Sequence, residues 1–421
     1  MVSIYLHLPF CIHKCPYCSF FVMPTNELAK EKLQEQQTKY LGHLRTQITL
    51  WKELLPQERL KTLYIGGGTP LQLGKARLLE LIAHTLTTWG SEFLEELTIE
   101  WNPDPLEGVI TAIKEIGDAY PQLYRLRHSI GIQSFDDAVL KASKRNYTFE
   151  QVQEFLRSLQ SIKQQNRCYN LDFIAFGMEQ DGKTQDRWDD EKRAFFQRIA
   201  KSQTFDSFSV YSLEHSQGSD WYHMASELRP AFDDETQTEE YITLQTMLLQ
   251  AGYTRYELSN YALTGKRSIH NMAYRLQEPY LGLGINATSC LPMHLVPEKL
   301  TKLAQGELKT DSKSIRFQTT NQRKKWDEDE FPYTIGEVIS PQLHRFEHCL
   351  LGLRTDRGVE GFASYADLLV PNWETQVADL CTEGFATYDA GHLVLTTLGM
   401  NVYNTIITNL FGEQVRETKS G

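Results

Sequence analysis

Three cysteines near the start of the chain constrain its fold more than any other feature. Cys11, Cys15 and Cys18 stand on one short loop, directly after the mostly apolar run Val2–Phe10, which predicts a buried strand. Three thiolates on one loop can hold three corners of an iron–sulfur cluster and leave the fourth iron open to another ligand. A structural zinc loop and three unrelated core thiols are the alternatives. Zinc would need a fourth ligand, and His13 inside the loop is poorly placed to be one.

The length and composition fit a globular protein with a large core. A chain of 421 residues predicts about two or three domains. Hydrophobic residues make up 41% and charged residues 23%, an ordinary composition for a soluble protein. No run approaches the roughly 18 to 20 apolar residues of a membrane span, and no secretory signal precedes Val2, so we expect a cytoplasmic protein.

Charge and cysteine usage narrow the location and the partners further. The chain has seven cysteines, and those outside the loop (Cys168, Cys290, Cys349 and Cys381) are expected to be core thiols in a reducing compartment. The net charge of −11 argues against nucleic acid as a partner, because phosphate binding needs a basic surface. It leaves open a peripheral membrane contact through a local patch.

Short β-rich runs alternate with longer amphipathic stretches, which predicts βα units around a parallel sheet. Strands are expected at Val2–Pro9, Thr62–Gly67, Leu97–Asn102, His128–Phe135, Asn170–Gly177 and Ser207–Leu213. Helices are expected at Glu27–Leu54, Lys75–Thr88, Phe149–Gln165 and Asp186–Ser202. Six units are too few for a closed eight-stranded barrel, so the sequence predicts an α/β fold with a partial (β/α)6 TIM-like barrel. Its site should lie at the C-terminal ends of the strands, where the cysteine loop leaves the first one.

The pattern changes after the predicted core domain, residues 1–292. Residues 293–340 are charged and irregular, which indicates a linker. Residues 341–421 suggest three helices, a hairpin around Asp389–Gly391 and a last helix, the order of a winged-helix-like α+β domain. This segment has five lysine and arginine residues against ten aspartate and glutamate residues. It is therefore a poor DNA binder, and we expect it to pack against the core or cover the site.

Polar residues interrupt the predicted strands at the end that carries the cysteine loop. Gly66–Thr69 ends the second strand, and its glycines let a ligand approach and leave N–H groups free to bind it, although a plain tight turn is the alternative. Glu100 in an apolar strand needs a partner such as a cationic amine, unless it is solvated or ion-paired internally. Gln133 and Asp172 are likewise polar side chains in otherwise apolar strands. Arg145 can reach the same end of the strands and bind a carboxylate or a ribose.

A histidine motif, His270–Arg275, lies after these strands. A histidine beside asparagine and aromatic residues can ligate heme iron axially, whereas the sequence alone favours a hydrogen-bonded structural histidine. His215 and His223 follow the sixth predicted strand and are candidates for a second ligand or for surface residues.

Taken in order, segments along nearly the whole chain resemble the coproporphyrinogen III oxidase-like radical S-adenosylmethionine (SAM) proteins, and within them the heme-chaperone branch. The segments that carry the resemblance are Tyr5–Cys11, the cysteine loop, Gly66–Pro70, Ser129–Phe135, Asn170–Asp172, Tyr256–Tyr261, His270–Asn271, Leu350–Arg354 and Leu395–Gly399.

The resemblance implies cofactors and residues that hold them. It implies a 4Fe–4S cluster held by Cys11, Cys15 and Cys18. It implies SAM bound by Tyr5, Tyr17, Gly67, Gly68, Thr69, Glu100, Gln133, Arg145 and Asp172. It also implies heme binding, with His270 as the candidate ligand, and transfer of heme to respiratory proteins at the membrane. The sequence leaves open whether the protein forms a homodimer.

Three positions depart from one branch or the other. Phe20 stands where the dehydrogenase branch of the family would carry a fourth cysteine, which favours the chaperone branch. The short segment before Tyr5 favours the same branch, because the dehydrogenase branch has a longer N-terminal segment. Arg275 stands where the chaperone motif has tryptophan, and Thr288 where a family pattern has histidine. An oxygen-independent coproporphyrinogen III dehydrogenase, or another radical SAM enzyme that acts on a tetrapyrrole, is the alternative. Whether the chain is an enzyme stays open.

Overall fold

A mixed sheet runs through the molecule. In a computed structural model that describes residues 1–104, 106–178, 188–225, 230–304 and 306–412, this sheet has twelve strands. Their order across the sheet is β14-β13-β12-β11-β1-β4-β5-β6-β7-β8-β10-β9. The strands are β1 (Val2–Leu8), β4 (Leu60–Gly67), β5 (Glu96–Trp101), β6 (Leu126–Gln133), β7 (Arg167–Ala175), β8 (Ser207–Ser212), β9 (Thr254–Glu257), β10 (Asn260–Ala262), β11 (Tyr280–Leu283), β12 (Thr288–Pro292), β13 (Ser314–Thr319) and β14 (Tyr333–Ile339).

The six predicted strands are confirmed as β1 and β4 to β8, with ends shifted by a few residues. Each pairs in parallel with the next, so their C-terminal ends meet at one edge of an open, partial barrel. Nearly every residue of β1 is buried, although its apolar residues alternate with Ser3, Tyr5 and His7, so both faces of this strand are covered.

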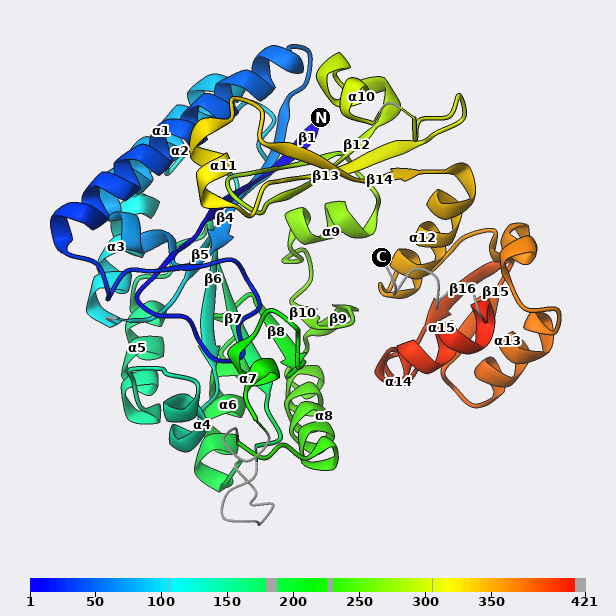
Figure 1. Ribbon diagram of the computed structural model, residues 1–421. Coiled ribbons are helices and arrows are strands. Elements are labelled where there is room, and N and C mark those ends of the chain that lie inside the picture. The colour runs from blue at the N-terminus through cyan, green and yellow to red at the C-terminus, as the bar shows by residue number, and fades with distance from the viewer. Residues whose placement is uncertain (105, 179–187, 226–229, 305, 413–421) are drawn as a thin grey trace.

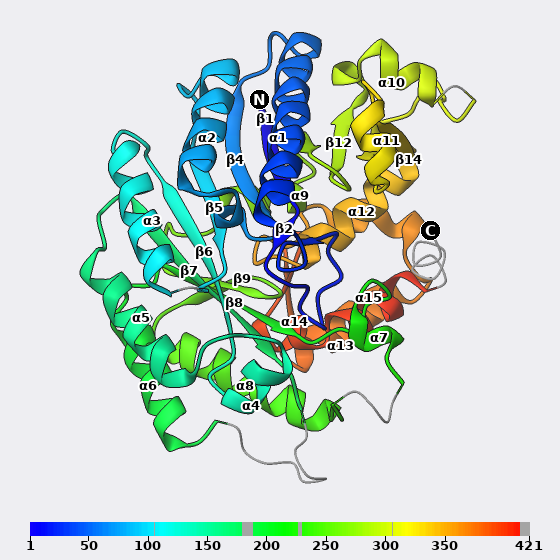
Figure 2. The same cartoon turned by 60° about the vertical axis from the view of Figure 1, so that its left-hand side comes forward.

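Helices cover the outer face of the sheet (Figures 1 and 2). Those that follow the parallel strands are α1 (Lys30–Leu54), α2 (Lys75–Trp89), α3 (Leu106–Ala119), α5 (Phe149–Ser161), α6 (Asp190–Lys201) and α8 (Asp234–Gln250). α5 begins at a capping box in which Thr148 and Gln151 satisfy each other's backbone N–H groups. The four predicted helices are present as α1, α2, α5 and α6. Residues 186 and 187, the predicted start of the last one, lie outside the described residues.

The prediction of a linker over residues 293–340 is wrong. This segment contains β13 and β14, which pair antiparallel with each other, and β13 pairs with β12. It also contains α10 (Glu298–Leu303) and α11 (Arg323–Glu328). Ile315 and Phe317 are fully buried, whereas Arg316 between them pairs with Glu337 across the strands. Such half-buried strands alternate apolar and charged residues, so their composition resembles that of a loop.

Residues 341–412 form a separate hydrophobic cluster around Phe346, Leu353, Leu393 and Leu410. Its elements are α12 (Pro341–Leu353), η3 (Phe362–Leu368), α13 (Trp373–Thr382), β15 (Ala386–Asp389), β16 (His392–Leu395), α14 (Thr397–Asn401) and α15 (Tyr403–Phe411). This is the helix and hairpin order of a winged-helix-like unit. Residues 413–421, the end of the predicted domain, lie outside the described part of the chain.

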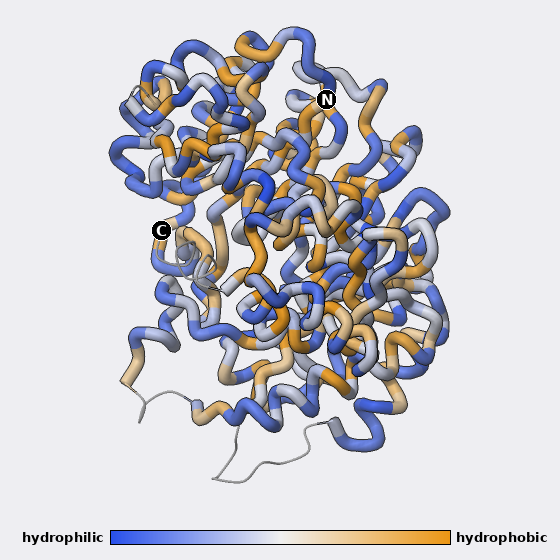
Figure 3. The backbone as a smooth tube through the Cα atoms, turned by 90° about the vertical axis from the view of Figure 1, so that its right-hand side faces the viewer, coloured by the Kyte–Doolittle hydropathy of each residue, from blue (hydrophilic) through white to orange (hydrophobic). Residues whose placement is uncertain are grey.

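The C-terminal unit (orange to red in Figure 1) faces the inner side of the sheet, opposite α1 and α2. Figure 3 shows hydrophobic segments gathered inside the molecule and hydrophilic ones outside. The remaining short elements are β2 (Phe10–Cys11), β3 (Met23–Pro24), η1 (Pro70–Leu73), α4 (Asp137–Ala142), α7 (Asp220–His223), α9 (Ile269–Arg275) and η2 (Met293–Leu295). Of the helices that the structure describes, none combines the length and apolarity needed to cross a bilayer.

Candidate functional site

A cavity of about 640 Å³ lies where the parallel strands end. Eleven of the thirteen residues predicted to hold a cluster or a cofactor line it. They are Cys11, Cys15, Cys18, Tyr17, Gly67, Gly68, Thr69, Glu100, Gln133, Arg145 and Asp172. These residues lie on the cysteine loop, at or just after the ends of β4, β5, β6 and β7, and, for Arg145, between α4 and α5, so the parallel sheet brings together residues far apart in the sequence.

Backbone pairing and side-chain hydrogen bonds hold the cysteine loop over the strand ends. β2 and β3 pair at its two ends, and the backbone N–H of Thr25 donates to the Cys11 carbonyl at 2.8 Å. Lys14 Nζ donates to the Gly218 carbonyl at 2.7 Å. These contacts fix the loop on both sides, and its three thiols face the same cavity.

The three thiols differ in how readily they ionise. Burial raises the pKa of Cys11 to about 11 and also raises the pKa of Cys18. Burial acts on Cys15 as well, but the positive charge of Arg145 and a hydrogen bond from His13 outweigh it and lower the pKa of Cys15. Iron binding displaces thiol protons and so makes all three ligands thiolates.

The donor set fits a cluster. Within the described ranges, no three His, Cys, Asp or Glu side chains converge as ligands of a single metal ion. Thiolates that hold a multi-iron cluster stand farther apart than the ligands of one ion, because each binds a different iron. Cys11, Cys15 and Cys18 are free thiols that line one cavity, and this is the donor chemistry that a 4Fe–4S cluster takes.

Arg145 is fixed beside the cysteines, and its Nε–H donor is unpaired within the described part of the chain. It donates from Nη2 to Tyr17 Oη at 2.6 Å and from Nη1 to Asn102. Its Nε is buried and has no hydrogen-bond partner among the described residues. A buried, unpaired donor on a charged group is costly, so Arg145 fits a ligand that supplies an acceptor, such as a carboxylate or a ribose hydroxyl.

Glu100 faces the cavity without a cationic partner. It accepts hydrogen bonds from Tyr64 Oη at 2.7 Å and from the Gly67 N–H at 2.9 Å. No lysine or arginine of the described chain forms an ion pair with it. Burial raises its pKa, and a cationic amine in the cavity would favour its charged form.

The glycine run differs from its prediction in one respect. Its N–H groups are not free, because those of Gly67, Gly68 and Thr69 donate to Glu100 and to the carbonyls of Leu8 and Phe10. The glycines are required for another reason. A Cβ on Gly66 would lie 2.4 Å from the Glu100 carboxyl carbon, and one on Gly68 would lie 2.6 Å from the Leu8 carbonyl. The run thus lets the cysteine loop and Glu100 approach the second strand closely.

Two further polar residues complete this wall. Asp172 accepts from Ser129 Oγ at 2.9 Å and from Asn170 Nδ2 at 2.7 Å, and burial raises its pKa. Gln133 has a positive φ of 70° at the end of β6. A left-handed glutamine stores strain, and such positions cluster at ligand sites.

His270 and Tyr5 do not line the cavity. His270 is 1% exposed, and its two ring nitrogens lie 2.7 Å from Thr62 Oγ1 and 2.6 Å from Tyr274 Oη. Burial lowers its pKa to about 3. Both ring nitrogens are thus engaged by hydroxyl groups in this arrangement, which fits the structural alternative for His270. Tyr5 lies behind the glycine run, 3.0 Å from His7 Nδ1.

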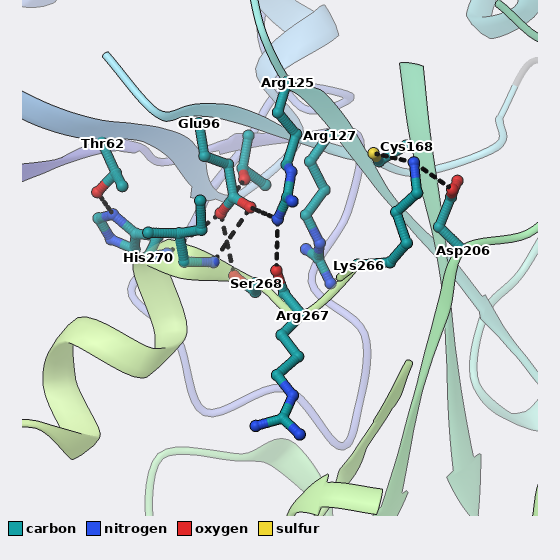
Figure 4. A network of polar contacts seen from close by, with 12 residues as sticks. Thr62, Glu96, Arg125, Arg127, Cys168, Asp206, Lys266, Arg267, Ser268 and His270 are labelled. Carbon is teal, nitrogen blue, oxygen red and sulfur yellow. Dashed lines mark hydrogen bonds and ion pairs between the residues drawn. The ribbon is translucent and has the colours of Figure 1, made fainter. Parts of the chain in front are cut away.

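The surroundings of His270 are a structural network (Figure 4). The fully buried Glu96 accepts from Ser268 Oγ and from the His270 N–H, each at 3.2 Å, and so ties the start of α9 to β5. The other two histidines considered as ligands also lie outside the cavity lining. The His215 ring packs against Phe232, and His223 is exposed.

Several other residues that line the cavity were not predicted as ligands. They include Phe20, Tyr64, Trp101, Tyr211, Tyr256, Glu257, Met272, Tyr274 and Arg354, and Arg275 lines the cavity with them. Tyr64 and Trp101 sit beside predicted residues on the same strands, where position alone could have indicated them. Arg354 belongs to the C-terminal unit, and only the docking of that unit brings it to the cavity.

The chain is similar in sequence to several known proteins. Residues 5–178 match the model of the radical SAM superfamily. This segment is a radical SAM domain. It is 29% identical to the heme chaperone HemW of Lactococcus lactis over 294 residues, 69% of each protein. It is 28% identical to the heme chaperone HemW of Bacillus subtilis over 425 residues, 98% of this chain and 100% of that protein.

A solved structure shares the fold. The radical SAM enzyme coproporphyrinogen III oxidase (HemN) of Escherichia coli superposes with a TM-score of 0.71 and 18% sequence identity, over 98% of this chain and 90% of that one. The likeness extends through the C-terminal unit and supports the predicted architecture of a partial barrel with a smaller second unit.

Proposed function

We propose that this protein is a heme chaperone on a radical SAM scaffold. It binds a 4Fe–4S cluster, SAM and heme, and passes the heme to heme-accepting respiratory proteins. The observation that carries the proposal is one cavity that joins the three cysteines to a wall of aromatic and arginine side chains. The full-length likeness to a heme chaperone supports it.

The cysteine side of the cavity holds the cluster and SAM in this proposal. Cys11, Cys15 and Cys18 are the cluster ligands, and a bound cluster supplies an electron and an open iron position for the amino and carboxylate groups of SAM. Among the residues that the structure describes, Glu100 has no ion-pair partner and Arg145 Nε has no acceptor. These two groups suit the cationic and the oxygen-bearing parts of SAM respectively.

The rest of the cavity lining suits a flat, largely apolar ligand with acidic groups. It includes the aromatic and apolar residues Phe20, Tyr211, Tyr256 and Met272. The volume of about 640 Å³ lies within the range of pockets that enclose a small molecule. Arginines on the same wall favour a ligand that carries carboxylates.

Anaerobic reconstitution tests the cluster and the heme separately. The wild-type protein should bind iron and sulfide and should take up ferric heme with a Soret band. Cys11→Ala, Cys15→Ala and Cys18→Ala should each lose the cluster absorbance. Cys381→Ala, a half-buried thiol of the C-terminal unit, is the matched control and should keep it. Wild-type protein that binds no heme would remove the proposal.

An enzyme that acts on a tetrapyrrole is the second candidate. Glu100, Arg145 and the cysteines all line the cavity that would receive such a substrate, and this arrangement would also serve SAM-dependent chemistry. Reconstituted protein supplied with SAM, a reductant and coproporphyrinogen III decides between the two. Formation of protoporphyrinogen would establish the enzyme, whereas heme uptake without turnover would support the chaperone.

The proposal also includes heme transfer to an acceptor, a peripheral membrane contact and a homodimer. Heme-loaded protein mixed with an apo-hemoprotein from a respiratory chain should lose its Soret band to the acceptor. Sedimentation with vesicles would test a peripheral membrane contact, and analytical ultracentrifugation would test a homodimer.

A further inference from the structure

Arg275 and Arg354 share a single carboxylate at the wall of the cavity. Glu257 Oε1 lies 2.9 Å from Arg275 Nη2 and 3.3 Å from Arg354 Nη2. The Nε atoms of the two arginines also donate to this oxygen, at 3.1 and 3.3 Å. The other oxygen, Oε2, accepts from the Ser259 N–H at 3.0 Å and from Asn260 Nδ2 at 2.8 Å. Glu257 is therefore saturated by its neighbours.

This arrangement leaves one positive charge in excess. Within the described residues, Glu257 is the only carboxylate that forms an ion pair with either arginine. The Glu257 side chain is 4% exposed, whereas each arginine side chain is 30% exposed, and all three line the cavity. A buried anion thus fixes two guanidinium groups whose outer parts still reach the cavity.

The two arginines come from different parts of the molecule. Arg275 ends α9, which follows the parallel strands, and Arg354 directly follows α12 of the C-terminal unit. A guanidinium binds a carboxylate through paired N–H donors in a fixed plane. Two such groups facing one cavity make a site for an acidic group at the junction of the two units.

We propose that Arg275 and Arg354 bind a carboxylate side chain of the tetrapyrrole, so that the C-terminal unit contributes directly to ligand recognition. The proposal rests on the proposed function and adds which chemical group of the ligand is recognised, and where. The rings of Tyr256 and Tyr274 line the same wall, so the flat face of the ligand would lie against aromatic surface while its acidic group meets the arginines.

The test compares ferric heme with its dimethyl ester, in which both carboxylates are methylated. Wild-type protein should bind heme roughly tenfold or more tightly than the ester, because a charge-assisted hydrogen bond is lost with each methylation. Arg275→Gln and Arg354→Gln should each reduce this preference and leave ester affinity nearly unchanged. Arg345→Gln is the matched control, since Arg345 lies on α12 and pairs with the exposed Asp367.

The outcomes separate the two levels of the proposal. Wild-type protein that binds neither porphyrin overturns the proposed function and this inference with it. Wild-type protein that binds heme and ester equally overturns the inference alone, whatever the variants do. SAM titration on the same variants provides the last distinction. A loss of SAM affinity with an intact preference for heme would assign the pair to the carboxylate of SAM and overturn the inference.

Discussion

His7, His128 and His270 lie in the core as neutral imidazoles. Burial lowers the pKa of His7 to about 4 and those of His128 and His270 to about 3. Each ring is placed by a polar neighbour, as His128 Nδ1 is by Trp101 Nε1 at 3.0 Å. An imidazole in an unfolded chain titrates near 6.5. Folding therefore requires these side chains to stay unprotonated over a pH range in which the unfolded chain would take up protons.

The sign of the resulting pH dependence follows from the direction of these shifts. Below pH 6.5 the unfolded state binds protons that the folded state does not, so stability falls as pH falls toward the folded pKa values. His270→Gln removes one such group. We expect the slope of the unfolding free energy against pH to decrease by about 1.4 kcal/mol per pH unit between pH 6 and 4. Urea titrations at several pH values would measure it.

The same variant tests the structural role of His270. Its ring contacts Tyr64 and Tyr274 at centroid distances of 5.0 Å, so His270→Gln should lose about 1 to 3 kcal/mol of stability at pH 7. Heme affinity of the folded variant should remain close to that of wild type. A variant of normal stability that no longer takes up heme would return His270 to the binding site.

The elements of this fold differ in how far the sequence could predict them. The six parallel strands were predictable because each is a short β-rich run followed by a longer amphipathic stretch. β13 and β14 were missed because charged residues alternate with apolar ones, as Arg316 does with Ile315 and Phe317. The cysteine and strand-end residues of the site followed from local pattern. Arg354 did not, because its position depends on how the C-terminal unit docks.

The turn after β4 shows how one element supports the site. Gly67 has a φ of +100°, and a Cβ there would lie 2.2 Å from His7 Nδ1 and 2.9 Å from Tyr5 Oη. Gly74 also has a positive φ, +82°, but no atom lies within 4 Å of its Cβ position. A substitution at Gly74 would therefore cause backbone strain alone, whereas one at Gly67 would cause strain and a steric clash.

Gly74→Ala should therefore lose about 1 to 3 kcal/mol of stability through backbone strain alone. Gly67→Ala should lose more, because the methyl group displaces His7 or Tyr5 as well, and it should also weaken SAM binding. Chemical denaturation and SAM titration of both variants would measure this difference. Equal losses of stability with unchanged SAM affinity would show that the turn is not crowded in solution.

At the scale of the whole molecule, a few polar contacts join the C-terminal unit to the sheet. Arg267 pairs with Asp356 through both guanidinium arms. Asn401 accepts from Arg255 Nη1 at 2.6 Å. Glu257 is the most buried member of these contacts and the only one whose partners also line the cavity. The Glu257 carboxylate thus belongs both to the contact between the two units and to the candidate ligand site.

Glu257→Gln should loosen this joint while leaving each unit folded. The change leaves Arg275 and Arg354 without a neutralising charge, and removal of one partner from a buried pair costs about 3 to 5 kcal/mol. Because both arginines are partly exposed, we expect a smaller loss of about 2 kcal/mol. Limited proteolysis should cut the variant between the units sooner than wild type. Glu80→Gln, which breaks an exposed pair with Arg45, is the control and should change neither quantity. A Glu257→Gln protein as stable and as resistant as that control would mean that apolar contacts alone hold the C-terminal unit, and that Arg354 reaches the cavity without this carboxylate.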